Sequence, residues 1–216
     1  MTIDVSASAE QITDVTVEPN GAIVAAGWAE ISLVPAFDAV AYTSDGRLDS
    51  TFGHDGVERI DVSAGPDRAT ALSVQPDGKL VLVGSAAAGG RHEWGIVRLG
   101  PHGRLDPSFG DGGVVVTSFG PGFDGADAVA IQPNGKIVVA GRIRARATDD
   151  FGIVRFRIDG RHDITFGQGG RVLTDFAGGE DAIHALAIQT NGKILAAGEA
   201  TIDGKRRFAV ARYLPR

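Results

Sequence analysis

Cysteine is absent from the sequence, and so is any long apolar run. Without cysteine the chain cannot form disulfides, thiolate nucleophiles or thiolate-bound zinc and iron–sulfur centres. No apolar segment approaches the roughly 18 residues that a membrane-spanning helix needs, and residues 1–20 lack a basic start followed by an apolar stretch. We therefore expect a soluble, cytoplasmic protein with no membrane partner; an extracellular location stays open if the chain is an excerpt from a longer protein.

Basic residues are fewer than acidic residues. The 21 Lys and Arg residues are outnumbered by 27 Asp and Glu residues, which gives a net charge of −6. Nucleic-acid binding requires a basic surface or a dominant basic stripe, so nucleic acid is not an expected partner. The phosphate-binding loop, His-Glu-x-x-His, Gly-x-Ser-x-Gly and dinucleotide-binding motifs are all missing. The sequence therefore indicates no cofactor and argues against an enzyme without excluding one.

Glycine, by contrast, is abundant, and much of it belongs to an internal repeat. The turn Pro19-Asn20-Gly21 recurs at steps of 57 residues as Pro76-Asp77-Gly78, Pro133-Asn134-Gly135 and Thr190-Asn191-Gly192. The aromatic residue Phe37 returns as Trp94, Phe151 and Phe208, and the pair Phe52-Gly53 returns as Phe109-Gly110 and Phe166-Gly167. Because three independent markers share one period, the chain consists of four copies of one unit.

Each unit is predicted to contain four short strands. In the third unit the strands are expected over residues 126–131, 136–140, 151–156 and 171–176, since these apolar or alternating runs are bounded by turn residues and none is long enough for a helix. Four strands per repeat, without a helix, are typical of propeller blades. The predicted fold is all-β: a four-bladed β-propeller with four antiparallel strands per blade.

The ends of the chain predict how the ring closes. Met1 aligns with Glu58, so residues 1–6 correspond to the outer strand of a blade, whereas residues 182–213 supply only the first three strands of the last blade. We expect the N-terminal strand to complete that blade, because pairing the two ends leaves no sheet edge open. Residues 1–216 are then a single domain cut at one point of a circle.

The repeat resembles a known family, the bacterial delta-60 repeat proteins. Three segments carry the resemblance: Val74 to Lys79 (VQPDGK), Phe151 to Phe156 (FGIVRF) and Gly103 to Gly110 (GRLDPSFG). The resemblance extends over essentially the whole chain. It implies a β-propeller domain of uncharacterised function, and therefore a fold without an assigned activity.

Comparison of the four blades separates scaffold from candidate site. Arg98 and Arg155 share one repeat position and are expected to pair with Asp106 and Asp163. A ring of acids, one at the start of each blade, is expected to cap loop N–H groups, with an axial cation such as Ca²⁺ as the weaker alternative. These acids are Glu10, Asp67, Asp124 and Asp181.

The loops between the second and third strands differ most from blade to blade and are the predicted ligand-binding face. Trp28 stands out because its counterparts are Ser85, Arg142 and Glu199; an exposed Trp suggests an anchor for a ligand or partner, while packing on its own loop or in a dimer is the alternative. The predicted binding residues are Trp28, Ile31, Leu33, Arg91, His92, Arg142, Arg144, Arg146 and Arg206. Their chemistry favours an anionic, partly apolar small ligand or a protein partner.

Three functions stay open. The leading hypothesis is a non-catalytic binding module that uses this loop face. The second is a lyase, hydrolase or cyclase in which Asp127 and His184, at one repeat position on adjacent blades, act as an acid–base pair in the channel. The third is a structural scaffold, in which two chains assemble face to face or as one eight-bladed ring, so a homodimer is an expected alternative.

Overall fold

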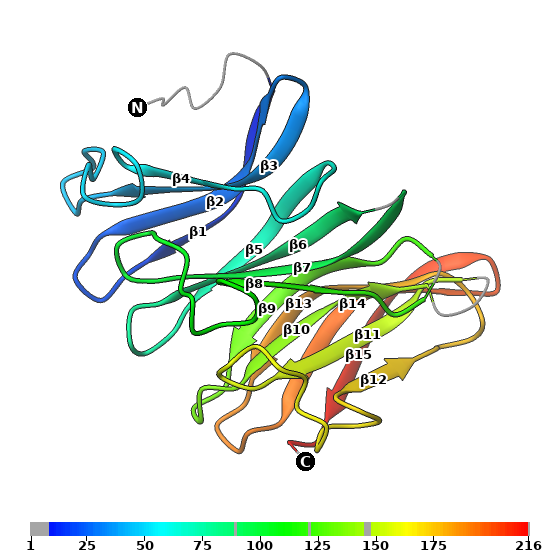
Figure 1. Cartoon of the computed structure of the whole chain (residues 1–216). Coiled ribbons are helices and arrows are strands. Elements are labelled where there is room, and N and C mark those ends of the chain that lie inside the picture. The colour runs from blue at the N-terminus through cyan, green and yellow to red at the C-terminus, as the bar shows by residue number, and fades with distance from the viewer. Residues whose placement is uncertain (1–8, 89, 121, 145–147, 216) are drawn as a thin grey trace.

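The chain folds into four antiparallel sheets that follow one another like blades (Figure 1). The computed structural model describes residues 9–88, 90–120, 122–144 and 148–215. These residues form fifteen strands and no helix; accordingly, no helix in the described ranges is long and apolar enough to cross a membrane. The predicted all-β architecture of four blades is confirmed.

Within each blade the strands lie in sequence order. Blade one holds β1 (Glu10–Val17), β2 (Ile23–Ile31), β3 (Val34–Tyr42) and β4 (Val57–Ile60). Blade two holds β5 (Asp67–Val74), β6 (Leu80–Ala88), β7 (Arg91–Leu99) and β8 (Val114–Thr117). Blade three holds β9 (Gly125–Ile131), β10 (Ile137–Ile143), β11 (Asp150–Phe156) and β12 (Arg171–Thr174). Blade four holds β13 (Asp181–Ile188), β14 (Ile194–Ile202) and β15 (Lys205–Tyr213).

The second and third strands of a blade extend further than the sequence predicted. Residues assigned to long loops continue the ladder up to the pairs Ile31↔Val34 and Ile202↔Lys205. The hairpin turns of blades one and four therefore contain two residues each, Ser32-Leu33 and Asp203-Gly204. All four residues have positive φ, as two-residue hairpin turns of this type require. Most of the predicted loop-face residues consequently lie on strand ends.

A β-bulge in the inner strand of every blade explains one invariant glycine. The register of β1 and β2 shifts between Ile12 and Asp14, and the other three blades shift at the equivalent place. Opposite the bulge stands Gly27, where a Cβ atom would lie 1.9 Å from the carbonyl oxygen of Gln11. Only glycine allows so close an approach of the two strands, which is why all four blades keep it there.

The hydrophobic core is divided among the junctions between blades. One cluster joins blades one and two around Phe37 and Leu82, a second joins blades two and three around Trp94 and Ile143, and a third joins blades three and four around Phe151. Each blade thus buries its side chains against its neighbours and not within itself, as expected for repeat architectures.

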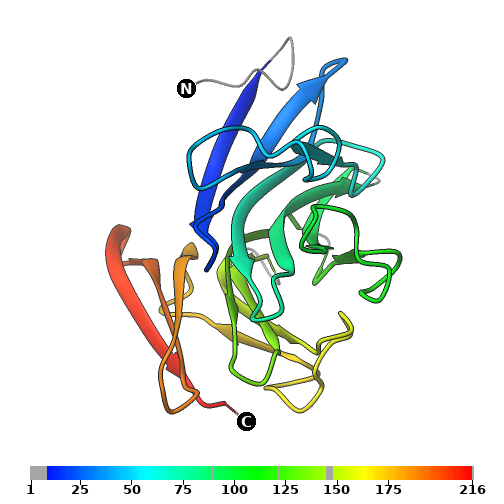
Figure 2. The same cartoon turned by 90° about the vertical axis from the view of Figure 1, so that its left-hand side faces the viewer.

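Closure of the ring is not confirmed. In the described residues blade four has three strands, and β15 pairs only with β14. The predicted fourth strand, within residues 1–6, lies outside the described residues. Figure 1 shows the first blade at the upper left and the last at the lower right, and Figure 2 shows the four blades along an arc with the first and last blades at its two ends. Phe208 of blade four is fully exposed, so nothing in the described part of the chain covers that end.

Candidate functional site: the hairpin face and the scaffold beneath it

The hairpin of blade one carries the most unusual of the predicted binding residues. Leu33 is 81% exposed at the tip and has a φ of +67°, and Ser32 before it has a φ of +55°. Trp28, expected to be exposed, is half-buried. Its ring lies under the guanidinium of Arg68 from blade two, whose Cζ is 4.7 Å from the ring centroid. Trp28 thus contributes to the junction between blades as well as to the face.

Two of the predicted cationic residues are already held by carboxylates of the chain. Arg144 Nε lies 2.7 Å from Asp149 Oδ1, and Arg144 Nη2 lies 3.4 Å from Glu180 Oε1. Arg206 Nη1 lies 2.9 Å from Glu199 Oε1. These pairs reduce the positive charge that the face offers to an anion.

The other predicted face residues are divided. His92 packs against Phe123, an exposed residue of the connection between β8 and β9, with ring centroids 5.0 Å apart. Arg91 and Arg142 are exposed. The side chain of Ile31 and the whole of Arg146 lie outside the described part of the structure.

The buried acids at the starts of the blades accept backbone hydrogen bonds. Asp67 Oδ2 accepts from the N–H groups of Val62 and Ser63, both at 2.8 Å. Asp124 and Asp181 accept the equivalent bonds from Phe119, at 3.1 Å, and Phe176, at 2.9 Å. Among the described residues, no three of the four predicted ring acids lie within 4.8 Å of one another. The structure therefore uses Asp67, Asp124 and Asp181 as loop caps.

Three acidic residues, one of them a predicted ring acid, bring their carboxylates close together. Carboxylate oxygens of Asp150, Asp175 and Asp181 lie within 4.8 Å of one another where blades three and four meet. Asp175 Oδ1 accepts the N–H of Ala177 at 3.0 Å, and Asp181 is a loop cap. Oxygen ligands of this kind are those that Ca²⁺ takes, but these oxygens are already used as hydrogen-bond acceptors.

The predicted acid–base pair occupies the bulge position. Thr13 and Thr70 stand there in blades one and two, and their hydroxyls donate to the carbonyls of Ala69, at 3.0 Å, and Ala126, at 2.6 Å. The bulge residue thus ties blade one to blade two and blade two to blade three.

Asp127 and His184 are the bulge residues of blades three and four. Burial raises the pKa of Asp127, while the charges of Arg142 and His184 oppose that rise. The acid–base pair stays a prediction, and its position has a structural use in blades one and two.

The lysine, arginine and aspartate that recur in blades two and three form an ion cluster around a buried aspartate. In blade two, Asp106 Oδ2 lies 2.9 Å from Arg98 Nε and 3.1 Å from Lys79 Nζ. Arg98 also stacks on Phe109, with Cζ 4.6 Å from the ring centroid. Blade three repeats the cluster with Asp163, Arg155 and Lys136, with both ion-pair distances 2.7 Å. The predicted Arg–Asp pairs are confirmed.

The cluster binds neighbouring blades together. Arg155 Nη1 donates to the carbonyl of Pro215 at 2.8 Å, and Arg98 Nη1 donates to the equivalent carbonyl of Ile158. Although burial opposes ionisation of Asp163, hydrogen bonds from Lys136 and Thr165 and the charge of Arg155 hold its pKa well below the usual range. These motif residues are scaffold.

The repeat unit matches a family model described as a domain of unknown function (DUF5122) β-propeller. The matches are residues 18–52, 75–109, 132–166 and 189–215, which together are more than half of the chain. The chain belongs to this family. The match confirms the predicted resemblance to repeat propellers of the delta-60 kind. None of the curated proteins compared with the chain matches it.

The matched segments explain why family membership assigns no activity to this DUF5122 propeller. In blades two and three each segment contains the lysine, arginine and aspartate of the ion cluster and ends at the buried Phe109 or Phe166. The shared residues are therefore those that build and join blades. Any function must come from residues in which the blades differ.

One such residue was missed by the sequence analysis. Asp38 on β3 stands where the other blades have Gly95, Gly152 and Ala209. It is only 6% exposed, its Oδ2 accepts the N–H of Ala29 at 3.0 Å, and its buried Oδ1 has no hydrogen-bond partner in the described residues. The signal that could have found it is a charged residue at a position that is otherwise glycine or alanine.

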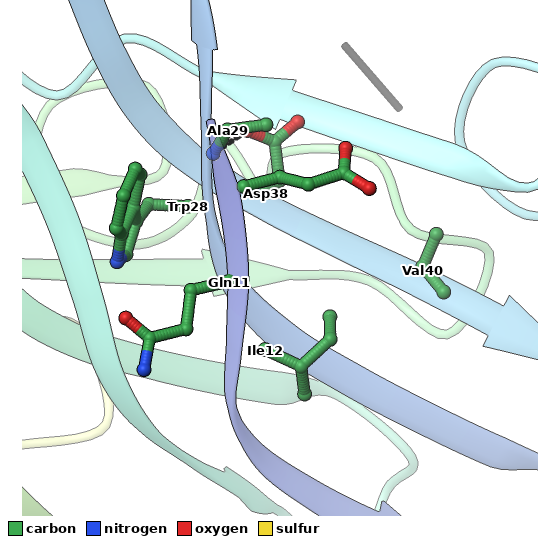
Figure 3. Close-up of a pocket in the computed structure, with 7 residues that line it drawn as sticks. Gln11, Ile12, Trp28, Ala29, Asp38 and Val40 are labelled. Atoms are coloured by element: carbon green, nitrogen blue, oxygen red, sulfur yellow. Dashed lines mark hydrogen bonds between the residues drawn. The ribbon is translucent and has the colours of Figure 1, made fainter. Parts of the chain in front are cut away.

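Asp38 lines a pocket on the open side of blade one, together with Glu10, Ile12 and Ala29. Figure 3 shows Trp28 and Gln11 on one side of β1, with Ile12 and Asp38 on the other. Burial raises the pKa of Asp38 to about 7, although Arg59, 3.5 Å away, opposes the rise.

Proposed function

We propose that this DUF5122 propeller is a non-catalytic binding module that engages a protein partner at the hairpin face, with Leu33 as its apolar anchor. The observation that carries the proposal is a large apolar side chain, 81% exposed, on a residue with a φ of +67°. Neither burial nor backbone preference accounts for a leucine at this point.

Backbone energetics support this interpretation. A non-glycine residue in the left-handed region costs roughly 1–2 kcal/mol, and the equivalent turn residues in blades two and four are Gly90 and Gly204. Blade one thus retains leucine where glycine is less strained. Local strain that persists at an exposed apolar tip is typical of contact sites.

The surroundings of Leu33 favour a protein over a small anion. Val34 and Phe123 add exposed apolar area at the same end of the blades, and the Trp28 ring lies at the base of the hairpin. Aromatic and apolar anchors with a polar rim are characteristic of protein interfaces. The ion pairs of Arg144 and Arg206 make recognition of a free anion the weaker alternative.

A peptide-display selection against the wild-type protein tests the proposal. Selected peptides are expected to lose at least about tenfold in affinity, equivalent to about 1.4 kcal/mol, on a Leu33→Gly variant. The same substitution relieves positive-φ strain, so it is expected to raise the free energy of unfolding by about 1 kcal/mol. Loss of binding by a more stable protein cannot be attributed to misfolding.

The matched control is Ile164→Asp, which changes another largely exposed apolar residue, between β11 and β12. Peptides are expected to bind this variant with unchanged affinity. Selection of no binder, or of peptides that bind the Leu33→Gly variant as tightly as wild type, would contradict the proposal.

A further inference from the structure

The last blade has an exposed apolar side that is buried in every other blade. Phe208 is fully exposed, whereas the aromatic residues at the same position, Phe37, Trp94 and Phe151, are fully buried. Val210, two residues along β15, is also largely exposed. In blades one to three this side is covered by the next blade. We call it the Phe208 face.

The first blade has the complementary exposed side. Ile12 is 55% exposed, whereas its equivalents Ala69, Ala126 and Ile183 are fully buried. Val15 and Val17 on the same strand are exposed too. In blades two to four this side covers the preceding blade. We call it the Ile12 face.

The existing junctions show how two such faces meet. The Phe37 ring of blade one lies against blade two: its Cζ is 3.4 Å from the place of a Cβ on Gly95, and Ala86 belongs to the same core cluster. The residues equivalent to Gly95 and Ala86 on the Ile12 face are Asp38 and Ala29. Both line the pocket of Figure 3, so this pocket is the socket for an incoming aromatic side chain.

We infer that the Phe208 face of one chain docks on the Ile12 face of a second copy. Two such contacts, related by a two-fold axis, close a ring of eight blades in which the two new junctions have the same order of strands as the three within the chain, with Asp38 in place of Gly95 beside the incoming ring. Head-to-tail interfaces form closed rings when the rotation closes, and eight blades lie within the usual range for propellers.

A second copy is favoured over the chain's own first blade. The three built junctions have closed cores, and in the described part of the chain no strand of blade one pairs with a strand of blade four. To bring the two faces together within one chain, the packing at these junctions would have to change. A second copy satisfies both faces and leaves every junction as it is.

Charge complementarity supports this pairing. Glu93 of blade two lies near Asp124 of blade three, and its charge contributes to the raised pKa of that residue. The next junction brings Asp150 close to Asp181. At the open ends the equivalent residues are Arg207, on the Phe208 side, and Glu10, on the Ile12 side. Two junctions within the chain thus bring two acids together, whereas a junction between two copies brings Arg207 close to Glu10.

The bulge position adds a polar contact. Thr13 and Thr70 each donate to the next blade, to Ala69 and Ala126. At the open end His184 stands at the donor position, and the matching carbonyl belongs to Ile12. His184 is exposed and lines a hollow with Arg207 and Phe208. An imidazole N–H can replace the threonine hydroxyl as the donor.

Light scattering on the full chain tests the inference. We expect a particle of twice the chain mass of 22.4 kDa. Phe208→Asp and Ile12→Asp are each expected to give monomers, and because both residues are exposed the fold is retained. An equimolar mixture of the two variants is expected to recover the dimer, since it contains one intact Phe208 face and one intact Ile12 face. Ile164→Asp and Leu33→Gly are the controls and stay dimeric.

Cross-linking separates a second copy from closure within one chain. The chain has no cysteine, so Ile12→Cys and Phe208→Cys introduce unique thiols. A short bismaleimide is expected to join the two single variants when they are mixed. The inference would be overturned by a monomeric wild-type mass or by dimers that survive both Asp substitutions. It would also be overturned if the two Asp variants did not form a dimer on mixing, or if the double Cys variant were cross-linked efficiently within a single chain. None of these readouts depends on a loop-face partner.

Discussion

Asp38→Asn is expected to make the folded chain more stable at neutral and alkaline pH. Asp38 is a buried acid whose pKa is raised to about 7 by burial, and its Oδ1 has no hydrogen-bond partner in the described residues. Asn keeps an acceptor for the Ala29 N–H but carries no charge at any pH. The substitution therefore removes the cost of ionising a buried group, which outweighs the attraction of Arg59 that it also removes.

The size and sign of the effect follow from linkage. In the unfolded chain the carboxyl loses its proton near its ordinary pKa of 3.8, whereas in the folded chain it does so near 7. Because the folded state holds the proton more tightly, stability from this group is complete below the unfolded pKa and is lost as the pH rises towards 7. Three pKa units at 1.36 kcal/mol each give a loss of about 4 kcal/mol that the Asn variant does not suffer.

Urea unfolding followed by circular dichroism measures this difference. Both proteins carry Phe208→Asp, so that assembly does not contribute. The advantage of the Asn variant is expected to be below about 1 kcal/mol at about pH 4 and to reach about 4 kcal/mol at about pH 8. An advantage that is the same at both pH values, or that shrinks as the pH rises, would refute the assignment of Asp38 as a buried acid with a raised pKa.

Two further predictions compare equivalent residues in blades three and four. Each variant again carries Phe208→Asp, except the one in which residue 208 is itself alanine. Phe151→Ala is expected to cost about 3–5 kcal/mol of unfolding free energy because its side chain is fully buried, whereas alanine at the exposed position 208 is expected to match aspartate there within about 0.5 kcal/mol. Arg155→Leu is expected to cost about 3 kcal/mol, since it leaves the buried Asp163 without its arginine, whereas Arg212→Leu changes an exposed side chain and is expected to cost almost nothing. Urea titrations of the four proteins check both comparisons, and equal costs in the two blades would show that blade four is as fully covered as blade three.

Much of the scaffold was predictable because its determinants are local or repeated at a fixed spacing. Asx-Gly turns define the hairpins, and the four predicted strands of blade three agree with β9 to β12 to within a few residues. The Arg155–Asp163 pair was predictable since both residues recur in the neighbouring blade. That Lys136 joins the same carboxylate was not, because the distance between strands is set by packing.

The candidate site was less predictable. Trp28 appeared to be an exposed anchor, but Arg68 from the next blade covers its ring, and a contact between blades leaves no trace in the spacing of either residue. Leu33 was identified as a face residue from variability alone; its positive φ, which distinguishes it, is a property of the backbone.

The sequence alone determined the number of blades, their four-strand plan and the family, because period, turn chemistry and strand alternation are encoded within each repeat. Only the tertiary structure decided which surfaces remain open. The rotation from one blade to the next depends on how side chains such as Phe37 and Trp94 pack at each junction, and the same 57-residue period is compatible with a closed ring of four or with half of a larger one. The exposed Phe208 and Ile12 faces are therefore a result of packing that periodicity could not reveal.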